Sequence, residues 1–342
     1  MMTRPNVKMT KKQLVLLVII AAGLAVFGIL TAISSAIART QTTQYSAKYW
    51  DPDGRYSMVS VFLPEDNPIT QSKVQQLEYT LDQALIKEAI EAPADNARLY
   101  VSSYSAKTQV SLSSGRSGSQ NCTAYGVGGD FFRFHNYELI SGSYLLEDSL
   151  MSDYAVLDEE AAWKVFGAIE VDGMTFKYNG KEYTVAGVVR PQDGYKTKAG
   201  GAEAGTVFFP IGELENVADS YEIIFPNPVS GFAVKQIKEA FSSCGYSEDD
   251  IKIVNNSERY GFVNSAKRLL KWTEKGMSFK AIKYPYWENS AIAVENIYDV
   301  FTLFRIIFIV PPIVIVIVSI IRFHPIHRLK LLVLRIVERF RK

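Results

Sequence analysis

Two long apolar segments lie near the two ends of this chain, and they limit what it can fold into more than any other feature. Residues 13–38 (QLVLLVIIAAGLAVFGILTAISSAIA) contain no charged residue, and residues 306–321 (IIFIVPPIVIVIVSII) are equally apolar. A helix needs about 20 apolar residues to cross a bilayer. The second segment reaches that length over 301–321, with Arg305 near the outer end, where its long side chain can extend to the interface. We therefore predict two transmembrane helices, 13–38 and 301–321, around a central region built like a soluble protein.

The charges that flank these segments predict the topology. Residues 1–12 carry four Lys or Arg residues and no acid, and residues 322–342 carry seven Lys or Arg residues against one Glu. Short flanks rich in Lys and Arg stay on the cytoplasmic side of a membrane. Both termini are therefore expected in the cytoplasm, with residues 39–300 outside it, in a multi-pass protein of the cell membrane. Residues 39–48 are polar and are expected to continue the first helix out of the bilayer.

A cleaved signal peptide is the alternative interpretation of the first segment. The apolar part of a signal peptide is usually about 7–15 residues long, and residues 13–38 form a far longer apolar run. A membrane anchor is therefore favoured.

The composition of the outer region, residues 39–300, indicates which partners and which cysteine chemistry to expect. It holds nearly all of the acidic residues and is net acidic, which argues against a nucleic-acid partner. Its two cysteines, Cys122 and Cys244, lie where a disulfide is chemically permitted. They are far apart in sequence and neither lies in a CxxC pattern, so two separate thiols are favoured over a bridge. The sequence leaves the pairing itself open.

Two stretches of the outer region each predict a strand, a helix and a second strand. Alternating apolar residues indicate the strands, and apolar residues at helical spacing indicate the helices. The expected elements are 56–63, 69–91 and 97–105 in the first unit and 220–225, 229–244 and 251–255 in the second. Two such units separated by an insertion are typical of a split ferredoxin-like lobe. We therefore predict an α+β membrane protein.

The insertion, about residues 111–214, is predicted to form a β-rich lobe. It begins with a Gly/Ser-rich stretch, 111–120, which is expected to be a mobile loop. Residues 158–166 predict a short helix. Residues 174–178 and 181–189 predict a hairpin, because Asn-Gly between two alternating runs is the strongest short hairpin signal.

Three consecutive segments of this insertion share a recognisable pattern. They are 138–148 (ELISGSYLLED), 154–167 (YAVLDEEAAWKVFG) and 174–189 (MTFKYNGKEYTVAGVV). In motif, order and spacing they resemble the periplasmic core domain of MacB-type ABC transporter permeases, in which a β-rich lobe is inserted into a split α/β lobe. The motif residues themselves are glycines suited to turns and apolar residues suited to a core. The resemblance implies a bacterial membrane protein and supplies no catalytic residue.

The resemblance also implies partners, and the sequence departs from the family in one respect. Such permeases usually have at least four spans and work with an ATPase, whereas two spans are predicted here. Residues 322–342 predict a basic amphipathic helix, suited to lying on the inner membrane surface or to docking on an ATPase. Its basic side chains include Arg328, Lys330, Arg335 and Arg339. Pro311 and Pro312 should kink the second span, as a hinge or as a tolerated bend.

Several kinds of chemistry are not supported by the sequence. It contains no G-x-x-x-x-G-K-[ST] motif, so a partner would have to hydrolyse any ATP. The glycine-rich residues 126–129 are predicted as a loop and not as a phosphate site. Only three histidines are present, which disfavours a His-based triad or a zinc site. We therefore predict no catalytic, cofactor-binding or metal-binding residues and no enzymatic activity.

These observations favour a non-catalytic permease-like or accessory subunit of an ABC transporter complex. On this interpretation the partners are an ABC ATPase subunit, a full-length permease, the lipid bilayer and an unknown extracytoplasmic substrate or protein. The alternative is a membrane-tethered extracytoplasmic sensor or scaffold domain that works without ATP. The substrate, the direction of transport and the oligomeric state stay open at this stage.

Overall fold

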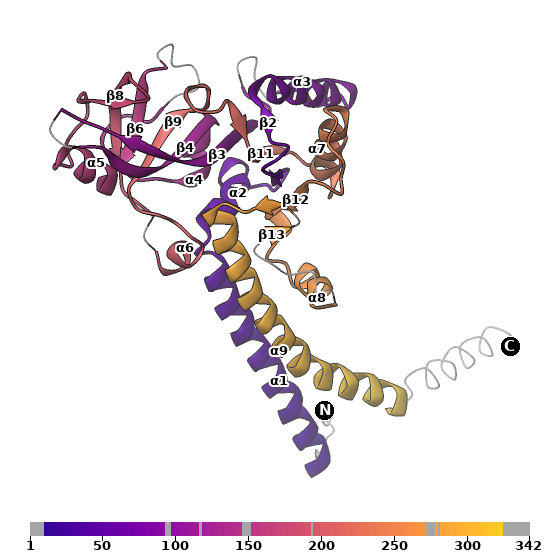
Figure 1. Ribbon diagram of the computed structural model, residues 1–342. Helices are drawn as coiled ribbons and strands as arrows, with labels where there is room; N and C mark the ends of the chain where they lie inside the picture. The colour runs from indigo at the N-terminus through magenta and orange to yellow at the C-terminus, as the bar shows by residue number, and fades with distance from the viewer. Residues whose placement is uncertain are drawn as a thin grey trace.

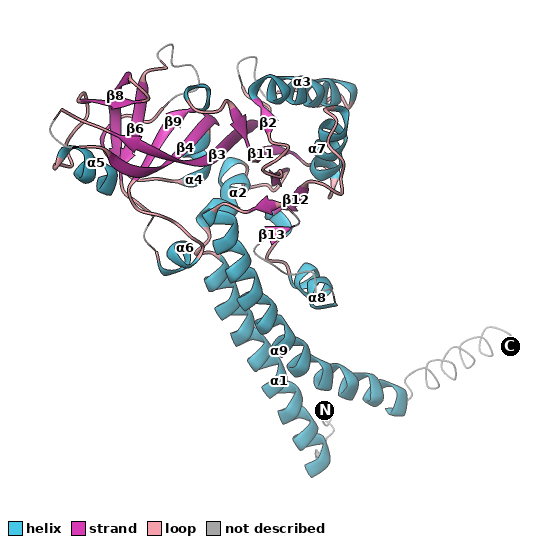
Figure 2. Cartoon of the chain, in the orientation of Figure 1, coloured by secondary structure: helices cyan, strands magenta, loops and turns pink. Residues whose placement is uncertain are grey.

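The computed structural model describes residues 10–92, 97–115, 118–145, 152–192, 194–270, 278–279 and 281–323. Figure 1 shows a domain built on a β-sheet, standing at one end of two long helices. Figure 2 shows that the strands lie in this domain and that only helices extend below it. The predicted α+β class with two flanking apolar helices is confirmed.

The strands form one large mixed sheet and two short pairs. In the sheet the order is β12-β1-β11-β3-β4-β9-β6-β8-β5, and β7 pairs with the free part of β8. The strands of the sheet are β1 (Tyr56–Phe62), β3 (Val101–Leu112), β4 (Gln120–Gly129), β5 (Leu139–Gly142), β6 (Tyr154–Asp158), β7 (Thr175–Tyr178), β8 (Lys181–Val189), β9 (Thr206–Pro210), β11 (Ser220–Pro226) and β12 (Lys252–Asn255). The short pairs are β2 (Ile69–Thr70) with β10 (Val217–Ala218), and β13 (Ser278–Phe279) with β14 (Ile282–Lys283).

The helices fall into two groups, those that cover the sheet and those that extend from it. The α-helices are α1 (Lys11–Ala38), α2 (Ser46–Trp50), α3 (Gln71–Lys87), α4 (Phe131–His135), α5 (Glu159–Phe166), α6 (Tyr195–Ala199), α7 (Phe232–Ser243), α8 (Phe262–Leu270) and α9 (Tyr286–Phe323). Three short 3₁₀ helices are η1 (Thr42–Tyr45), η2 (Ile211–Glu213) and η3 (Asn256–Glu258). Helices α1 and α9 extend from the domain, and the others lie against it or beside them (Figure 1).

One half of the sheet is a four-stranded antiparallel α/β lobe. The strands β12-β1-β11-β3 have the order expected of a ferredoxin-like fold that has been split between β3 and β11. Helices α3 and α7 pack on one face of this half, because their apolar residues at helical spacing meet the inward residues of the strands. Leu77, Val61, Tyr221 and Phe241 are all fully buried in this core. Both predicted β-α-β units are confirmed.

The other half is the β-rich lobe, with its own apolar core around Leu157, Phe176 and Phe209. The predicted hairpin is confirmed as β7 and β8. Asn179 and Gly180 at its turn both have positive φ, 50° and 81°, as a two-residue hairpin turn requires. The two lobes share one continuous sheet, because β3 pairs with β4 all the way from Ser103 opposite Gly129 to Leu112 opposite Gln120.

The two loop predictions at the start of the insertion have different outcomes. The predicted loop 111–120 is shorter at both ends, because residues 111–112 finish β3 and residue 120 begins β4, and its mobility stays a prediction. The glycine-rich residues 126–129 lie in β4 and not in a loop. Gly128 is needed there because the ring of Tyr104 lies where a Cβ atom would be placed. The glycines therefore serve side-chain packing across the strands.

The helices α1 and α9 run side by side in opposite directions, and both are long and apolar enough to cross a membrane. Helix α9 continues without interruption from Tyr286 through the predicted span, so one helix joins the domain to the membrane segment. Pro311 and Pro312 lie inside α9, which bends away from α1 toward its C-terminal end (Figure 1). The first helix ends at Ala38 and does not continue over 39–48 as predicted.

The early end of α1 has a local cause. The Thr40 hydroxyl donates a hydrogen bond of 2.7 Å to the carbonyl of Ile37, which satisfies one of the free carbonyl groups at the helix end. The chain then turns into η1 and α2 along the underside of the sheet. The residues 39–48 thereby join the domain to the head of α9 and do not lengthen the stalk.

Helix α1 packs closely against α9 at Gly23. A Cβ atom there would lie 2.6 Å from Cγ of Pro312 and 2.8 Å from the carbonyl oxygen of Phe308. Gly28 in the same helix has nothing within 4 Å of its Cβ position. Close packing of membrane helices depends on small residues at such contacts.

We expect Gly23→Ala to weaken the pairing of α1 and α9, because the new methyl group has no room next to a backbone carbonyl. Overpacking of this kind costs about 1–3 kcal/mol. The thermal stability of the purified protein in mild detergent measures the effect. Gly28→Ala is the matched control and should be neutral or stabilising by up to about 1 kcal/mol, because alanine favours a helix over glycine. Equal losses in the two variants would contradict the close contact.

The two cysteines are free and buried in different cores, Cys122 in the β-rich lobe and Cys244 in the α/β lobe. The interpretation of two separate thiols is therefore confirmed. Burial raises the pKa of the Cys122 thiol to about 11 and also raises the pKa of Cys244.

Because only the thiolate reacts, neither thiol should react with a water-soluble maleimide at pH 7 while the protein is folded. Both should react after unfolding in denaturant, as counted by mass spectrometry. A Tyr79→Cys variant, at an exposed position of α3, should add one thiol that reacts at once. Labelling of the folded wild-type chain would show that these cores open readily.

Candidate functional site

The head of α9 meets the domain through a group of buried ion pairs, which we call the junction network. Its acids, Glu288, Glu295 and Asp299, lie on one face of α9 because their spacing of seven and four residues matches the helical repeat. Its bases, Arg259 and Arg268, come from the chain just after η3 and from α8. The network thus connects α9 to the segment that follows the last strand of the sheet.

Arg259 is at the centre of the junction network. Its guanidinium binds both carboxylate oxygens of Glu288, at 2.6 and 2.8 Å, and binds Glu295 through Nε at 2.6 Å. Its side chain is only 3% exposed, as is that of Glu288. Burial opposes the charge, but the carboxylates of Glu288 and Glu295 outweigh it and raise the pKa of the Arg259 guanidinium above its usual value. The bidentate geometry fixes the orientation of both side chains.

Arg268 extends the network along α9. Its Nε lies 3.0 Å from Glu295, and its Nη2 donates a 2.8 Å hydrogen bond to Asp299. The same carboxylate accepts a 2.5 Å hydrogen bond from the hydroxyl of Ser265. Arg268 also donates to the backbone carbonyl of Arg259 at 2.7 Å. The two arginines and the three acids therefore form one connected unit.

A chain of polar contacts links this unit to the middle of the sheet. Asn256 lies 3.3 Å from Arg259 and donates a 2.7 Å hydrogen bond to the hydroxyl of Ser60 on β1. Ser60 donates in turn to Glu222 on β11 at 3.0 Å, and Glu222 lies 2.8 Å from Nε2 of His135. Each of these residues is buried. Buried polar groups need such partners, so the path from α9 to the sheet is constrained at each step.

The first turns of α9 also touch the β-rich lobe. The hydroxyl groups of Tyr286 and Tyr137 are 2.6 Å apart, and Asn289 donates a 3.1 Å hydrogen bond to the carbonyl of Gly200. The Trp287 ring lies with its centroid 4.2 Å from that of His135. One helix head is thus bound to both halves of the domain.

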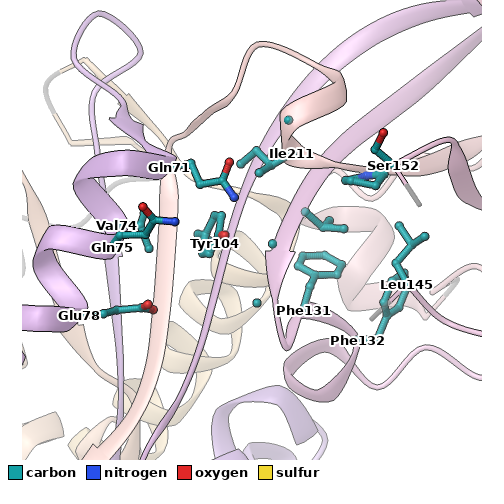
Figure 3. Close-up of a pocket in the computed structure, with 15 residues that line it drawn as sticks. Gln71, Val74, Gln75, Glu78, Tyr104, Phe131, Phe132, Leu145, Ser152 and Ile211 are labelled. Atoms are coloured by element: carbon teal, nitrogen blue, oxygen red, sulfur yellow. The ribbon is translucent and has the colours of Figure 1, made fainter. Parts of the chain in front are cut away.

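A cavity of about 420 Å³ lies between the two lobes. Figure 3 shows its two walls: Gln71, Gln75 and Glu78 of α3 on one side, and Phe131 and Phe132 on the other. The remaining lining includes Val74, Tyr104, Leu145, Ser152 and Ile211. A polar wall opposite an aromatic wall can hold an amphipathic ligand or a segment of a partner protein.

Three other features that could have formed a site are a cluster of metal ligands, the acidic residue Asp158 and the phenylalanines next to the cavity. No group of three or more His, Cys, Asp or Glu side chains that could hold a metal ion occurs in the described ranges. Asp158, one of an acidic cluster, is the N-cap of α5, where its carboxylate accepts a 2.7 Å hydrogen bond from the backbone N–H of Ala161. Phe131, Phe132 and Phe134 belong to the core, although the first two also face the cavity.

Of the residues predicted as sites, only the two prolines lie in the part of the chain that the structure describes. Arg328, Lys330, Arg335 and Arg339 lie outside the described residues. Pro311 and Pro312 lie in α9, and their role as a hinge stays a prediction. The junction network was missed by the sequence analysis, although the spacing of the three acids in one apolar helix is a signal that could have indicated a buried basic partner.

Residues 14–242 match the family of MacB-like periplasmic core domains. The structural similarities are weaker. The periplasmic region of MacB from Actinobacillus actinomycetemcomitans is 18% identical and aligns over 63% of this chain and 92% of its own length, with a TM-score of 0.44. The extracellular domain of the noncanonic ABC-type transporter YknZ from Gram-positive bacteria is 13% identical over 58% and 100%, with a TM-score of 0.40. No curated protein sequence matches the chain.

We expect Glu288→Gln to destabilise the attachment of α9, because the Arg259 guanidinium stays buried with one carboxylate fewer. Breaking a buried ion pair costs about 3–5 kcal/mol, and the lower end applies here since Glu295 remains. Urea unfolding in mild detergent, followed by tryptophan fluorescence, measures the loss. Glu239→Gln, which removes an exposed partner of Lys235, is the control and should change stability by about 0.5 kcal/mol or less. Equal effects would mean that the network contributes nothing specific.

Proposed function

Since the chain belongs to the family of MacB-like periplasmic core domains, which are parts of ABC-transporter-type permeases, we propose that it is a non-catalytic permease-like or accessory subunit of an ABC transporter complex. In this role it couples a partner ATPase to an extracytoplasmic domain that binds a substrate or a partner protein. The observation that carries the proposal is the attachment of α9 to both lobes, through the junction network on the side of the α/β lobe and through the contact of Tyr286 with Tyr137 on the side of the β-rich lobe. A simple tether needs no such attachment.

The mechanism follows from where α9 is bound. ATP hydrolysis by the partner displaces the membrane helices, and α9 carries that displacement to its head. There the pair of Arg259 with Glu288 moves the α/β lobe, and the contact of Tyr286 with Tyr137 moves the β-rich lobe. Close-packed interiors pass such displacements on with little loss. The cavity between the lobes changes shape as a result, which gives the outer domain two binding states.

The proposed topology places both termini in the cytoplasm and the sheet domain outside. The basic flanks 1–12 and 322–342 support this orientation. The antiparallel course of α1 and α9 brings the start of α1 and the end of α9 to the same end of the helix pair (Figure 1). The basic tail is then on the side where an ATPase would be found. Arg328, Lys330, Arg335 and Arg339 are the proposed contacts with it or with the inner membrane surface.

We expect an ABC ATPase to co-purify with the intact protein from native membranes in mild detergent. The protein with Arg328, Lys330, Arg335 and Arg339 all changed to Gln should lose the ATPase, because the docking charges are gone. Mass spectrometry of the bound chains and an ATP hydrolysis assay measure both. Lys235→Gln combined with Lys238→Gln, which removes basic residues from the outer helix α7, is the control and should retain the ATPase.

Two other outcomes have definite meanings. If the ATPase is retained by the tail variant, the complex exists but the tail is not its docking site. If only outer-surface proteins or no proteins are recovered, the coupling role is wrong. The chain is then better described as a membrane-tethered sensor or scaffold that works without ATP.

A further inference from the structure

Helix α8 has its polar and apolar faces the wrong way round for a helix of a soluble domain. The side facing the protein holds Ser265, which is fully buried, and Arg268, and both are bound to Asp299 of α9. The side facing outward holds apolar residues. Phe262 is 37% exposed, Val263 63% and Leu270 86%. Surface helices normally turn their apolar stripe toward the core.

The outward residues form one continuous stripe. At 100° per residue, positions 262, 263, 266 and 270 fall within about 100° of the helix circumference. Lys267 lies at the edge of this stripe and is exposed. A continuous apolar stripe with a basic residue beside it is the composition of helices that lie in the interface of a membrane.

The position of α8 fits that composition. The ring of Phe262 packs edge-on against Phe27 of α1, with 6.0 Å between the centroids. The Arg305 guanidinium of α9 lies 5.3 Å from the same ring. Figure 1 shows α8 below the sheet and beside α9. The helix is therefore beside the membrane helices and not on the surface of the domain.

The depth of these contacts can be placed along α9. At about 1.5 Å per residue, the stretch from Arg305 to Ile321 is about 24 Å long, compared with about 30 Å for the hydrocarbon core of a bilayer. Arg305 thus lies near the outer boundary of the apolar region. Phe27 of α1 lies at the same level as Arg305, because both contact the ring of Phe262.

Helix α8 also covers the charged side chain of Arg305. A charged side chain within a membrane helix is costly and is normally turned toward protein. Arg305 is 1% exposed and lies between the rings of Phe262 and Tyr298, with a hydrogen bond to Thr302. Phe262 of α8 is thus part of the cover that separates this charge from the surroundings of the helix pair.

We propose that α8 lies in the outer interface of the lipid bilayer, with Phe262, Val263, Ala266 and Leu270 among the acyl chains and Lys267 at the level of the phosphates. At the same level of the helix pair, Leu303, Phe304 and Ile307 of α9 are apolar and each about half exposed. This shared level favours lipid over a protein partner as the occupant. The inference depends on the two membrane helices and not on an ATPase.

The test places a nitroxide spin label on α8 of the full chain, reconstituted in vesicles of phosphatidylethanolamine and phosphatidylglycerol. Val263→Cys and Leu270→Cys carry the label, and the native thiols are protected by burial. Collision with oxygen, which concentrates in lipid, is compared with collision with a water-soluble nickel chelate. Tyr79→Cys on α3 is the aqueous reference and Ile307→Cys on α9 is the lipid reference.

We expect the ratio of oxygen to nickel collisions at positions 263 and 270 to be several-fold higher than at 79 and close to that at 307, with Lys267→Cys in between. A ratio equal to that at 79 would overturn the proposal, because the stripe would then face water. Low collision rates with both reagents, together with dipolar broadening between labels on separate copies, would also overturn it and assign the stripe to contact with a second copy.

Discussion

The Arg259 guanidinium is buried between the carboxylates of Glu288 and Glu295, and the placement of α9 against the domain depends on this contact. A buried charge is costly unless it is paired and hydrogen-bonded. Any sliding of α9 by one turn would separate the arginine from its acids and leave charges of both signs without partners. The position of the membrane helix relative to the sheet is therefore narrowly defined, which an apolar contact of the same area would not achieve.

This constraint matters because the two lobes share one sheet and yet have separate cores. The strands β3 and β4 run through both lobes, so bending of the sheet at this hairpin is the simplest way for the lobes to move relative to each other. The head of α9 is bound to both sides of that hairpin, through Glu288 on one side and Tyr286 on the other. The cavity lies between the lobes and is lined by Tyr104 of β3 and Gly128 of β4.

The parts of the fold that could be predicted are those decided by local sequence. The turn at Asn179-Gly180, the capping of α5 by Asp158 and the apolar spacing of α3 and α7 each involve residues close together in the chain. The wrong prediction for residues 126–129 has a distant cause. These residues pair with β3, and the ring of Tyr104 on that strand occupies the space that a side chain at Gly128 would need.

The candidate site could not be predicted for the same reason. Gln44 and Glu288 both contact Arg259, although they come from opposite ends of the outer region. No pattern within a short window indicates that these residues meet. The basic tail residues and the two prolines could be named as candidates because the type of a single residue, basic or proline, is enough to suggest them.

Helix α8 belongs both to the junction with α9 and to the proposed contact with the membrane surface. A pair of antiparallel helices has a single long axis, and a domain that stands on such a pair is free to tilt or rotate about it. A third contact with the membrane that lies off this axis removes much of that freedom. Asp299 of α9 binds Ser265 and Arg268 of α8. The proposed membrane contact of α8 is therefore attached directly to the junction network. In the proposed coupling, a displacement of α9 would then move part of the domain relative to a fixed membrane surface, so that the sheet would bend and the domain as a whole would not rotate.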